Sequence, residues 1–127
     1  IFKHREKAIK TQSAKAKGRK LQQWFRDQIL DTFSFSKDDV RSTSMGAAGE
    51  DILFSQKAGD ELGISVECKS RESMAVYAFY AQAADNCPEG RQPVVIVKQN
   101  NSTPLAVVDA EYYIKLLKGT NATLDNS

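Results

Sequence analysis

The sequence has few of the residues on which several familiar chemistries depend. It contains two cysteines and one histidine. Cys68 and Cys87 form no CxxC pair and have no histidine cluster near them, so we expect both thiols to stay reduced, in a cytoplasmic compartment. The histidine, His4, lies in a basic segment, and no Ser–His–Asp or Cys–His catalytic set can be assembled around it.

Long apolar runs and glycine-rich loops are also missing. No stretch of roughly eighteen apolar residues and no signal-peptide pattern is present, so we expect no association with a membrane. The seven glycines are scattered along the chain, which excludes the P-loop and dinucleotide-binding patterns. A chain of 127 residues is expected to form one domain, with a core that needs no disulfide bonds.

Charge is divided unevenly along the chain. Residues 1–26 hold nine Lys or Arg against one acidic residue, a net charge of +8, and because the whole chain carries +2 the remainder carries −6. A basic arm on an acidic body suits a protein that contacts phosphates with one part and holds divalent cations with another. The alternative is that the basic residues form a solvated helix face or tail.

Apolar periodicity predicts the elements of the domain. The expected elements are a helix at 19–33, strands at 51–55 and 64–69, a helix at 73–86, strands at 93–98 and 105–108, and a helix at 110–118. Gly18 is expected to interrupt the chain before the first helix, in which Trp24 and Phe25 are interpreted as core residues, with base stacking as the less favoured alternative. Residues 1–17 then form a basic arm or helix, 18–119 the folded domain and 120–127 a disordered tail.

This order of elements predicts an α/β fold. We expect two antiparallel hairpins joined by a crossover helix, which give a small mixed sheet with helices on its faces. Residues 34–48 are interpreted as a loop. Asp109 is a candidate N-cap of the last helix.

The most informative stretch is the strand at 64–69. Alternation along a strand places Glu67 and Lys69 on one face, about 7 Å apart, and Val66 and Cys68 on the other. Charged groups on a short central strand must be paired, hold a metal or face a cleft, because burying an isolated charge is costly. The chain also brings Asp51, on the preceding strand, toward this position. The pattern therefore predicts either an ordinary ion pair on an exposed sheet face or an acidic site in a cleft.

Taken together, several motifs resemble the PD-(D/E)XK nuclease superfamily, and within it the phage-type group similar to Holliday-junction resolvases. The motifs are Gly49-Glu50-Asp51, Val66-Glu67-Cys68-Lys69, a helix bearing Gln82, and a helix opening Lys17-Gly18-Arg19-Lys20-Leu21-Gln22-Gln23. The resemblance covers about 17–118. It implies a restriction-endonuclease-like α/β/α sandwich with a small mixed central sheet.

The resemblance implies a role for each residue of the signature. Asp51 and Glu67 would ligate a divalent cation, Mg²⁺ or Mn²⁺, with the backbone carbonyl of Cys68 as a further ligand. Lys69 would orient or activate the attacking water. Glu50 stands where many members have proline, and it is an alternative ligand.

Two glutamines belong to the same implied site. Gln23, or its neighbour Gln22, stands where many members carry a glutamate that completes the metal shell, so an amide there would act through water or on a phosphate. Gln82 matches a helical glutamine near the catalytic lysine of several relatives. Taken alone, each glutamine is better explained as an ordinary solvated helix residue.

Candidate contacts to DNA lie on the first helix, in a loop and at a strand end. These residues are Lys15, Lys17, Arg19, Lys20, Ser44 and Lys98. Ser44 as a plain loop serine and Lys98 as a solvated lysine are the alternatives.

The expected function is metal-dependent hydrolysis of DNA phosphodiesters, on branched or structured DNA such as the Holliday junctions of DNA recombination. The partners are DNA and a second copy of the chain in a homodimer or higher oligomer, because a four-way junction needs two matched cuts. The location would be the host cytoplasm if the chain is phage-encoded. The alternative is a non-catalytic DNA-binding or assembly module that retains the fold.

Overall fold

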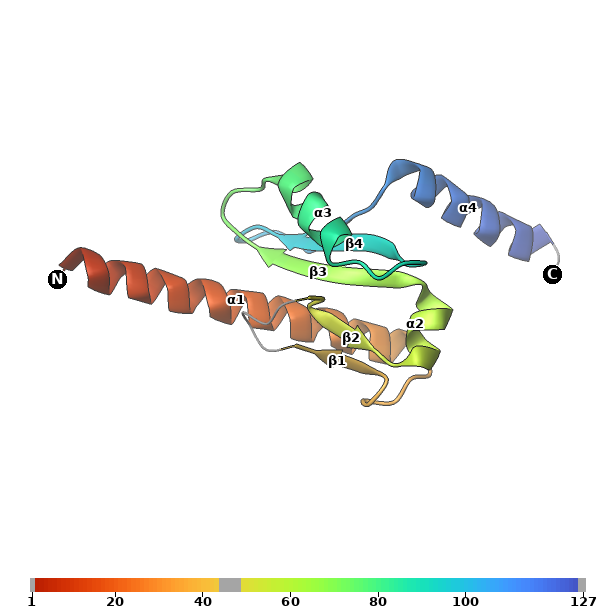
Figure 1. Cartoon of the computed structure of the whole chain (residues 1–127), viewed down its shortest axis with the longest axis horizontal. Helices are drawn as coiled ribbons and strands as arrows, with labels where there is room; N and C mark the ends of the chain where they lie inside the picture. The colour runs from red at the N-terminus through yellow and green to blue at the C-terminus, as the bar shows by residue number, and fades with distance from the viewer. Residues whose placement is uncertain (1, 44–48, 126–127) are drawn as a thin grey trace.

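The computed structural model describes the backbone of residues 2–43 and 49–125, and it shows a small α/β protein. In the described part there are four helices, five strands and two small sheets (Figure 1). The elements in order are α1 (Phe2–Thr32), β1 (Val40–Ser42), β2 (Ile52–Phe54), α2 (Gln56–Leu62), β3 (Ile64–Ser70), α3 (Val76–Asp85), β4 (Gln92–Lys98), β5 (Leu105–Val107) and α4 (Ala110–Asp125). Every strand and helix that the periodicity predicts is present, and β1 and α2 are added.

The strands pair differently from the two predicted hairpins. β2 pairs antiparallel with β1, whereas β3 pairs in parallel with β4, and β4 pairs antiparallel with β5. The mixed sheet therefore has the order β3-β4-β5, and the prediction that residues 51–55 and 64–69 form a hairpin is wrong. Only the second predicted hairpin, β4 with β5, forms.

The first hairpin fails because a helix stands where the glycine spacing predicts a turn. The Ser55 side chain caps α2 by accepting a hydrogen bond from the Ala58 backbone N–H, and Gly63, at φ 66°, ends it. Gly59, the other glycine of this segment, lies buried inside α2. With a helix between them, β2 and β3 need not be antiparallel neighbours.

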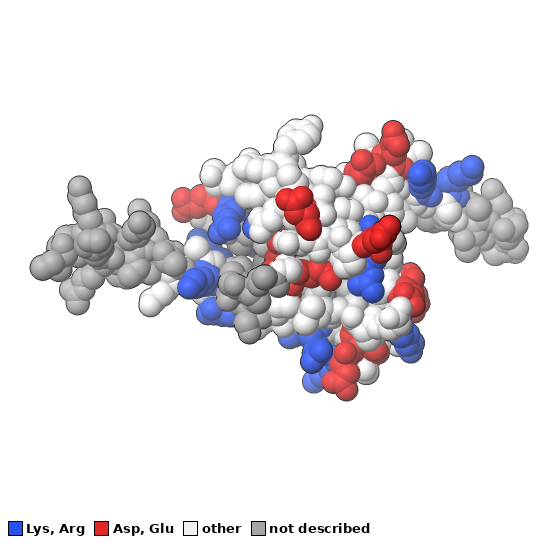
Figure 2. Space-filling view, viewed as in Figure 1, with Lys and Arg blue, Asp and Glu red and all other residues white. Residues whose placement is uncertain are grey.

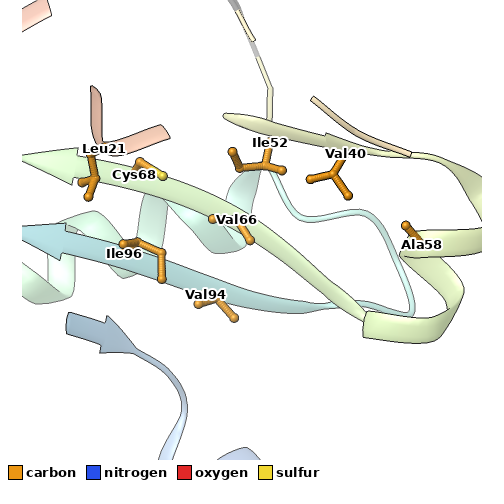
Figure 3. Close-up of a cluster of buried hydrophobic side chains, with 8 residues drawn as sticks. All are labelled: Leu21, Val40, Ile52, Ala58, Val66, Cys68, Val94 and Ile96. Carbon is orange, nitrogen blue, oxygen red and sulfur yellow. The ribbon is translucent and has the colours of Figure 1, made fainter. Parts of the chain in front are cut away.

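The core follows the two faces of β3 and β4. On one face, Val66, Cys68, Val94 and Ile96 pack with α1 and the small sheet through Leu21, Val40 and Ile52 (Figure 3). On the other face, Val95 and Val97 pack with Ala83 of α3. The mixed sheet thus has α1 and the small sheet on one side and α3 on the other (Figure 1).

The first helix is continuous, and the prediction that Gly18 interrupts it is wrong. Gly18 is buried within α1, at helical spacing from buried Leu21 and Gln22 and partly buried Phe25. A residue without a side chain lets the helix lie close to its neighbours, which offsets its poor helix propensity. The N-terminal part of α1 extends past the rest of the molecule (Figure 1).

Trp24 departs from its predicted place in the core. Phe25 packs against the core as expected, but Trp24 is 42% exposed. The buried stripe at 18, 21, 22 and 25 leaves position 24 beside it, at the margin of the contact with the sheet.

The C-terminal helix begins as predicted. Asp109 accepts a hydrogen bond from the Tyr112 backbone N–H at 3.0 Å, the contact expected of an N-cap. α4 runs to Asp125, so it continues into the segment 120–127 that the sequence predicts to be a disordered tail. Both cysteines are free thiols. None of the helices in the described residues is long and apolar enough to cross a membrane.

Asp39 connects the start of β1 with the start of α2. Its carboxylate accepts hydrogen bonds from Ser55 Oγ at 2.7 Å and from the Ser36 backbone N–H at 2.9 Å. The Ser55 bond is the main cause that lowers the pKa of Asp39 below its ordinary value of 3.8, with the Ser36 backbone bond next.

We expect Asp39→Asn to lower the thermal midpoint at neutral pH. Because the folded-state pKa is depressed, the charged form stabilises the fold fully above about pH 3.8, and that contribution is lost as the pH falls through the folded-state pKa. Melting curves followed by circular dichroism should therefore converge for wild type and variant in acid. The exposed neighbour Asp38, changed to Asn, is the matched control, and a gap that persists in acid would contradict the assignment.

Candidate active site

Glu67 is buried in the middle of β3. Its register partner in β4 is Val95, so its side chain lies on the face of the sheet that α3 covers. It is 3% exposed, and its Oε1 accepts a hydrogen bond from Asn86 Nδ2 at 3.0 Å. The predicted alternation is confirmed, because Val66 and Cys68 pack on the opposite face. Glu67 is therefore a carboxyl group held in the interior by an amide at the end of α3.

Asp51 lies along the free edge of β3. Its backbone N–H donates to the Val66 carbonyl at 3.1 Å, and its Oδ2 accepts a hydrogen bond from the Cys68 backbone N–H at 2.7 Å. The N–H and C=O of one strand residue point to the same side, so the Cys68 carbonyl also faces this edge. Asp51 thus satisfies an edge that would otherwise be unpaired, and it brings its carboxylate to the strand that holds Glu67.

The two carboxyl groups form one electrostatic unit. Burial is the main cause that raises the pKa of Glu67, and the charge of Asp51 and a hydrogen bond with it act in the same direction. Asn86, by contrast, favours the charged form of Glu67. Adjacent carboxylates repel each other unless a proton or a cation lies between them. The arrangement therefore disfavours two charged carboxylates side by side when no cation is bound.

Lys69 lies near this pair but not in a close ion pair with it. Its ammonium group lies 5.7 Å from the centre of the Phe79 ring of α3. The sole ion pair shorter than 4.0 Å among the described side chains is Arg26–Asp27. The alternative of a direct Glu67–Lys69 ion pair is thus not what the structure shows. Lys69 is partly exposed, with its charge available to an incoming group.

Other predicted residues take different places. Gln22 is buried at 2% exposure while Gln23 is exposed, so Gln22 is the amide on the buried stripe of α1. Gln82 is exposed, and its place on the sheet-facing side of α3 is taken by Asn86. Ser44 lies outside the described residues.

Glu50, the alternative ligand, lies close enough to Cys87 for its charge to act on that thiol. Burial raises the pKa of the Cys87 thiol, and the charge of Glu50 is a smaller cause in the same direction. Glu50 Oε2 is buried, and within the described part of the chain it accepts no hydrogen bond. Burial also strongly raises the pKa of Cys68, so neither thiol is an activated nucleophile.

Asn86 is the residue that sequence reasoning missed. It lies just after the last residue of α3, and it reaches Glu67, which is nineteen positions earlier in the chain. The signal was the helical spacing of Phe79, Ala83 and Asn86, because Phe79 and Ala83 both pack in the cluster on that face. Gln82 has the same spacing from Phe79 and Asn86, so it is the exposure of Gln82 in the structure that separates the two.

Three of the four lysines predicted to contact DNA line one groove. Lys17, Lys20 and Lys98 line it together with Trp24 and residues of the loop after β4. Lys15 and Arg19 are exposed on α1 but do not line this groove. Figure 2 shows acidic side chains near the centre of one face, and Lys and Arg side chains where α1 leaves the body of the molecule.

The donor set fits Mg²⁺ or Mn²⁺ rather than zinc. Within the described ranges no group of three or more His, Cys, Asp or Glu side chains is arranged to hold a metal. Mg²⁺ is usually held by one or two carboxylates and several waters, a requirement that Asp51, Glu67 and the Cys68 carbonyl meet. Zinc sites use three or four protein side-chain ligands, mostly Cys and His, and the described residues gather no such set.

Comparison with known proteins adds no relative. No model of a known protein family matches the sequence, and neither the curated proteins nor the solved structures contain a significant match.

Proposed function

We propose that this protein is a divalent-metal-dependent endodeoxyribonuclease of the PD-(D/E)XK type, acting on branched or structured DNA. The observation that supports it is the meeting of Asp51 and Glu67 at β3, with Lys69 two positions further along the same strand. Under this proposal the mixed sheet, with α1 on one side and α3 on the other, is a small restriction-endonuclease-like α/β/α sandwich.

The residues divide the work of hydrolysis among them. Asp51 and Glu67, with the Cys68 carbonyl, would hold Mg²⁺ or Mn²⁺. When bound, such an ion lowers the pKa of water and neutralises charge on the phosphate. Asn86 keeps the Glu67 carboxylate in place and favours its charged form. Lys69 positions the attacking water and stabilises negative charge that develops at phosphorus. Lys17, Lys20 and Lys98 bind neighbouring phosphates.

A panel of labelled DNA substrates tests the proposal directly. Four-way junctions, flaps, nicked duplex and linear duplex, each with Mg²⁺, Mn²⁺ or EDTA, should show metal-dependent cleavage that favours branched forms. Absence of cleavage of every form, combined with salt-sensitive binding through the basic residues, would instead support the second candidate, a non-catalytic DNA-binding module. One observation favours the non-catalytic module. The Asp51 carboxylate already has a structural role, because it accepts a hydrogen bond at the edge of β3.

Cleavage of a junction requires two symmetric cuts, so the proposal includes a homodimer. α4 exposes Tyr113, Ile114, Leu116 and Leu117, which provide apolar surface for such pairing. Light scattering measures the mass of the protein alone and bound to a four-way junction. A monomer in both states would contradict this part of the proposal.

Asn86→Ala should weaken the affinity for Mn²⁺ about 10- to 100-fold, the usual effect of removing a partner that orients a metal ligand. The loss of its hydrogen bond would also raise the pKa of Glu67 further, which favours the proton over the cation. Isothermal titration of Mn²⁺ measures the affinity without any cleavage. Gln82→Ala, in the last turn of α3, is the matched comparison. Equal losses in the two variants would show that Asn86 has no special role.

A further inference from the structure

A groove of about 680 Å³ lies at the carboxyl ends of the two parallel strands. Ser70 and Lys98, register partners at the ends of β3 and β4, form part of its floor. It is lined by Lys17, Lys20, Leu21, Trp24, Ser70, Lys98, Asn100, Asn101 and Pro104. In open α/β sheets, ligands bind outside the carboxyl ends of parallel strands. Side chains alternate along β3, so Ser70 lies on the α1 side of the sheet and Lys69 on the α3 side, and the groove and the candidate active site are on opposite faces of the sheet.

One wall of the groove is a single face of α1. Lys17, Lys20 and Trp24 are separated by three and four positions, so they project side by side from the helix. Leu21 anchors this face, because it is 3% exposed and belongs to the core. Trp24 is 42% exposed and is the only tryptophan in the chain. The helix therefore presents an indole ring on the same face as two ammonium groups.

The opposite wall is a braced polar loop. Lys17 Nζ donates to Asn100 Oδ1 at 2.9 Å, and Asn100 Nδ2 donates to Glu72 Oε1 at 3.3 Å. Gln99 Nε2 donates to the Glu72 carbonyl, also across to the segment after β3. Asn101 adopts φ 60°, a left-handed conformation that asparagine tolerates. The amides of this loop are thus held in place beside the lysines.

We propose that this groove binds an unpaired stretch of DNA, with one base stacked on Trp24 and the adjoining phosphates on Lys20 and Lys98. Positive charge along a groove combined with an exposed aromatic ring is the chemistry by which proteins bind single strands. Every base has a face that can stack on indole, whereas the bases of intact duplex are stacked on one another and offer only phosphates. The inference rests on the proposed nuclease function in taking DNA as the ligand, and it identifies the unpaired strand of a branched substrate as the feature recognised.

Fluorescence of the single tryptophan tests this stacking without cleavage. Oligothymidylate, titrated in EDTA, should quench the emission of Trp24 saturably, and a blunt duplex of equal length should quench it far less. Polyphosphate is the control for charge alone, and it should bind without quenching. Quenching of equal size by duplex, or by polyphosphate, would overturn the proposal. So would quenching by oligouridylate but not oligothymidylate, because it would assign the groove to RNA.

Variants test the two kinds of contact separately. By anisotropy of labelled oligothymidylate, Trp24→Ala should weaken binding at least about fivefold, the lower end of the loss for one stacked base, and Trp24→Phe should lose less. Lys98→Gln should weaken binding and flatten its salt dependence, while Lys115→Gln on exposed α4 should change neither. Unchanged affinity in folded Trp24→Ala, checked by circular dichroism, would refute the stacking.

These results are independent of catalysis. Quenching by single strands in a protein that cuts no DNA would refute the nuclease function and leave the groove assignment standing. Cleavage of branched DNA by Trp24→Ala at wild-type affinity and rate would refute the groove assignment and leave the nuclease function standing. A Trp24 emission that changes with protein concentration alone would show that a second copy of the chain covers the ring, and would overturn the proposal.

Discussion

Glu67→Gln should reduce Mg²⁺-dependent cleavage by at least about 100-fold and at the same time raise the thermal stability of the metal-free protein. Mutation of a residue that only orients a metal ligand lowers metal affinity or activity about 10- to 100-fold. Removal of the charge of a ligand itself should therefore lower activity by more. The gain in stability has a separate cause. Burial and the nearby Asp51 disfavour the charged form of Glu67, so a neutral side chain of the same shape removes that penalty.

The substitution leaves the local contacts in place. The side-chain amide oxygen of the variant can still accept the hydrogen bond from Asn86 Nδ2, and the amide N–H can donate to the Asp51 carboxylate. The variant should therefore fold, and its loss of activity should report on charge alone. A site that is more stable without its functional charge is typical of residues placed for chemistry rather than for folding.

Thermal melts with and without Mn²⁺ separate the two effects. Mn²⁺ should raise the midpoint of the wild-type protein, because a ligand that binds the folded state stabilises it, and should not raise that of Glu67→Gln. Glu61→Gln, at an exposed position on α2, is the control for removing a glutamate charge outside the carboxylate pair. Cleavage by Glu67→Gln at the wild-type rate would remove the basis for the nuclease proposal.

The sequence predicted best those parts of the fold whose signals are local and repeated. The β-branched run of β4 and the alternation of Val66, Glu67 and Cys68 in β3 need no knowledge of their neighbours. β1 is only three residues long, too short to show a period, and α2 depends on a single serine cap. The predicted helix at 73–86 is the crossover that the parallel pairing of β3 with β4 needs, whereas the loss of the first hairpin could not be read until α2 was known to replace a turn.

The candidate site was predicted in the same uneven way. Asp51, Glu67 and Lys69 lie on or beside strands, where a period of two fixes the direction of each side chain. The helical partners were less certain, because an error of one position on a helix turns a side chain by about 100°. Gln23 was favoured although its neighbour Gln22 is the buried residue. Gln82 was likewise favoured although it is exposed, and Asn86 is the residue that contacts Glu67. Asn86 is recognised only once α3 is packed on the sheet.

Lys69→Met should lower the rate of the cleavage step by at least about 100-fold while leaving metal binding and DNA affinity nearly unchanged. Groups that transfer or orient a proton in the transition state contribute about 10²- to 10⁴-fold. Methionine keeps the length of the side chain, and its sulfur packs well against the Phe79 ring that now lies near the ammonium. The fold should therefore be preserved, and the Mn²⁺-dependent rise in melting temperature should match that of the wild type.

The contrast with Lys98→Met makes this prediction specific. Lys98 lines the groove and is expected to act on phosphates, so its loss should raise KM for a branched substrate and change kcat little. Single-turnover cleavage with saturating enzyme measures the step on which the two lysines should differ. If Lys69→Met and Lys98→Met show the same profile, Lys69 is another phosphate contact. The carboxylate pair would then lack its partner in hydrolysis, and the non-catalytic DNA-binding module would be the better account of the β3 cluster.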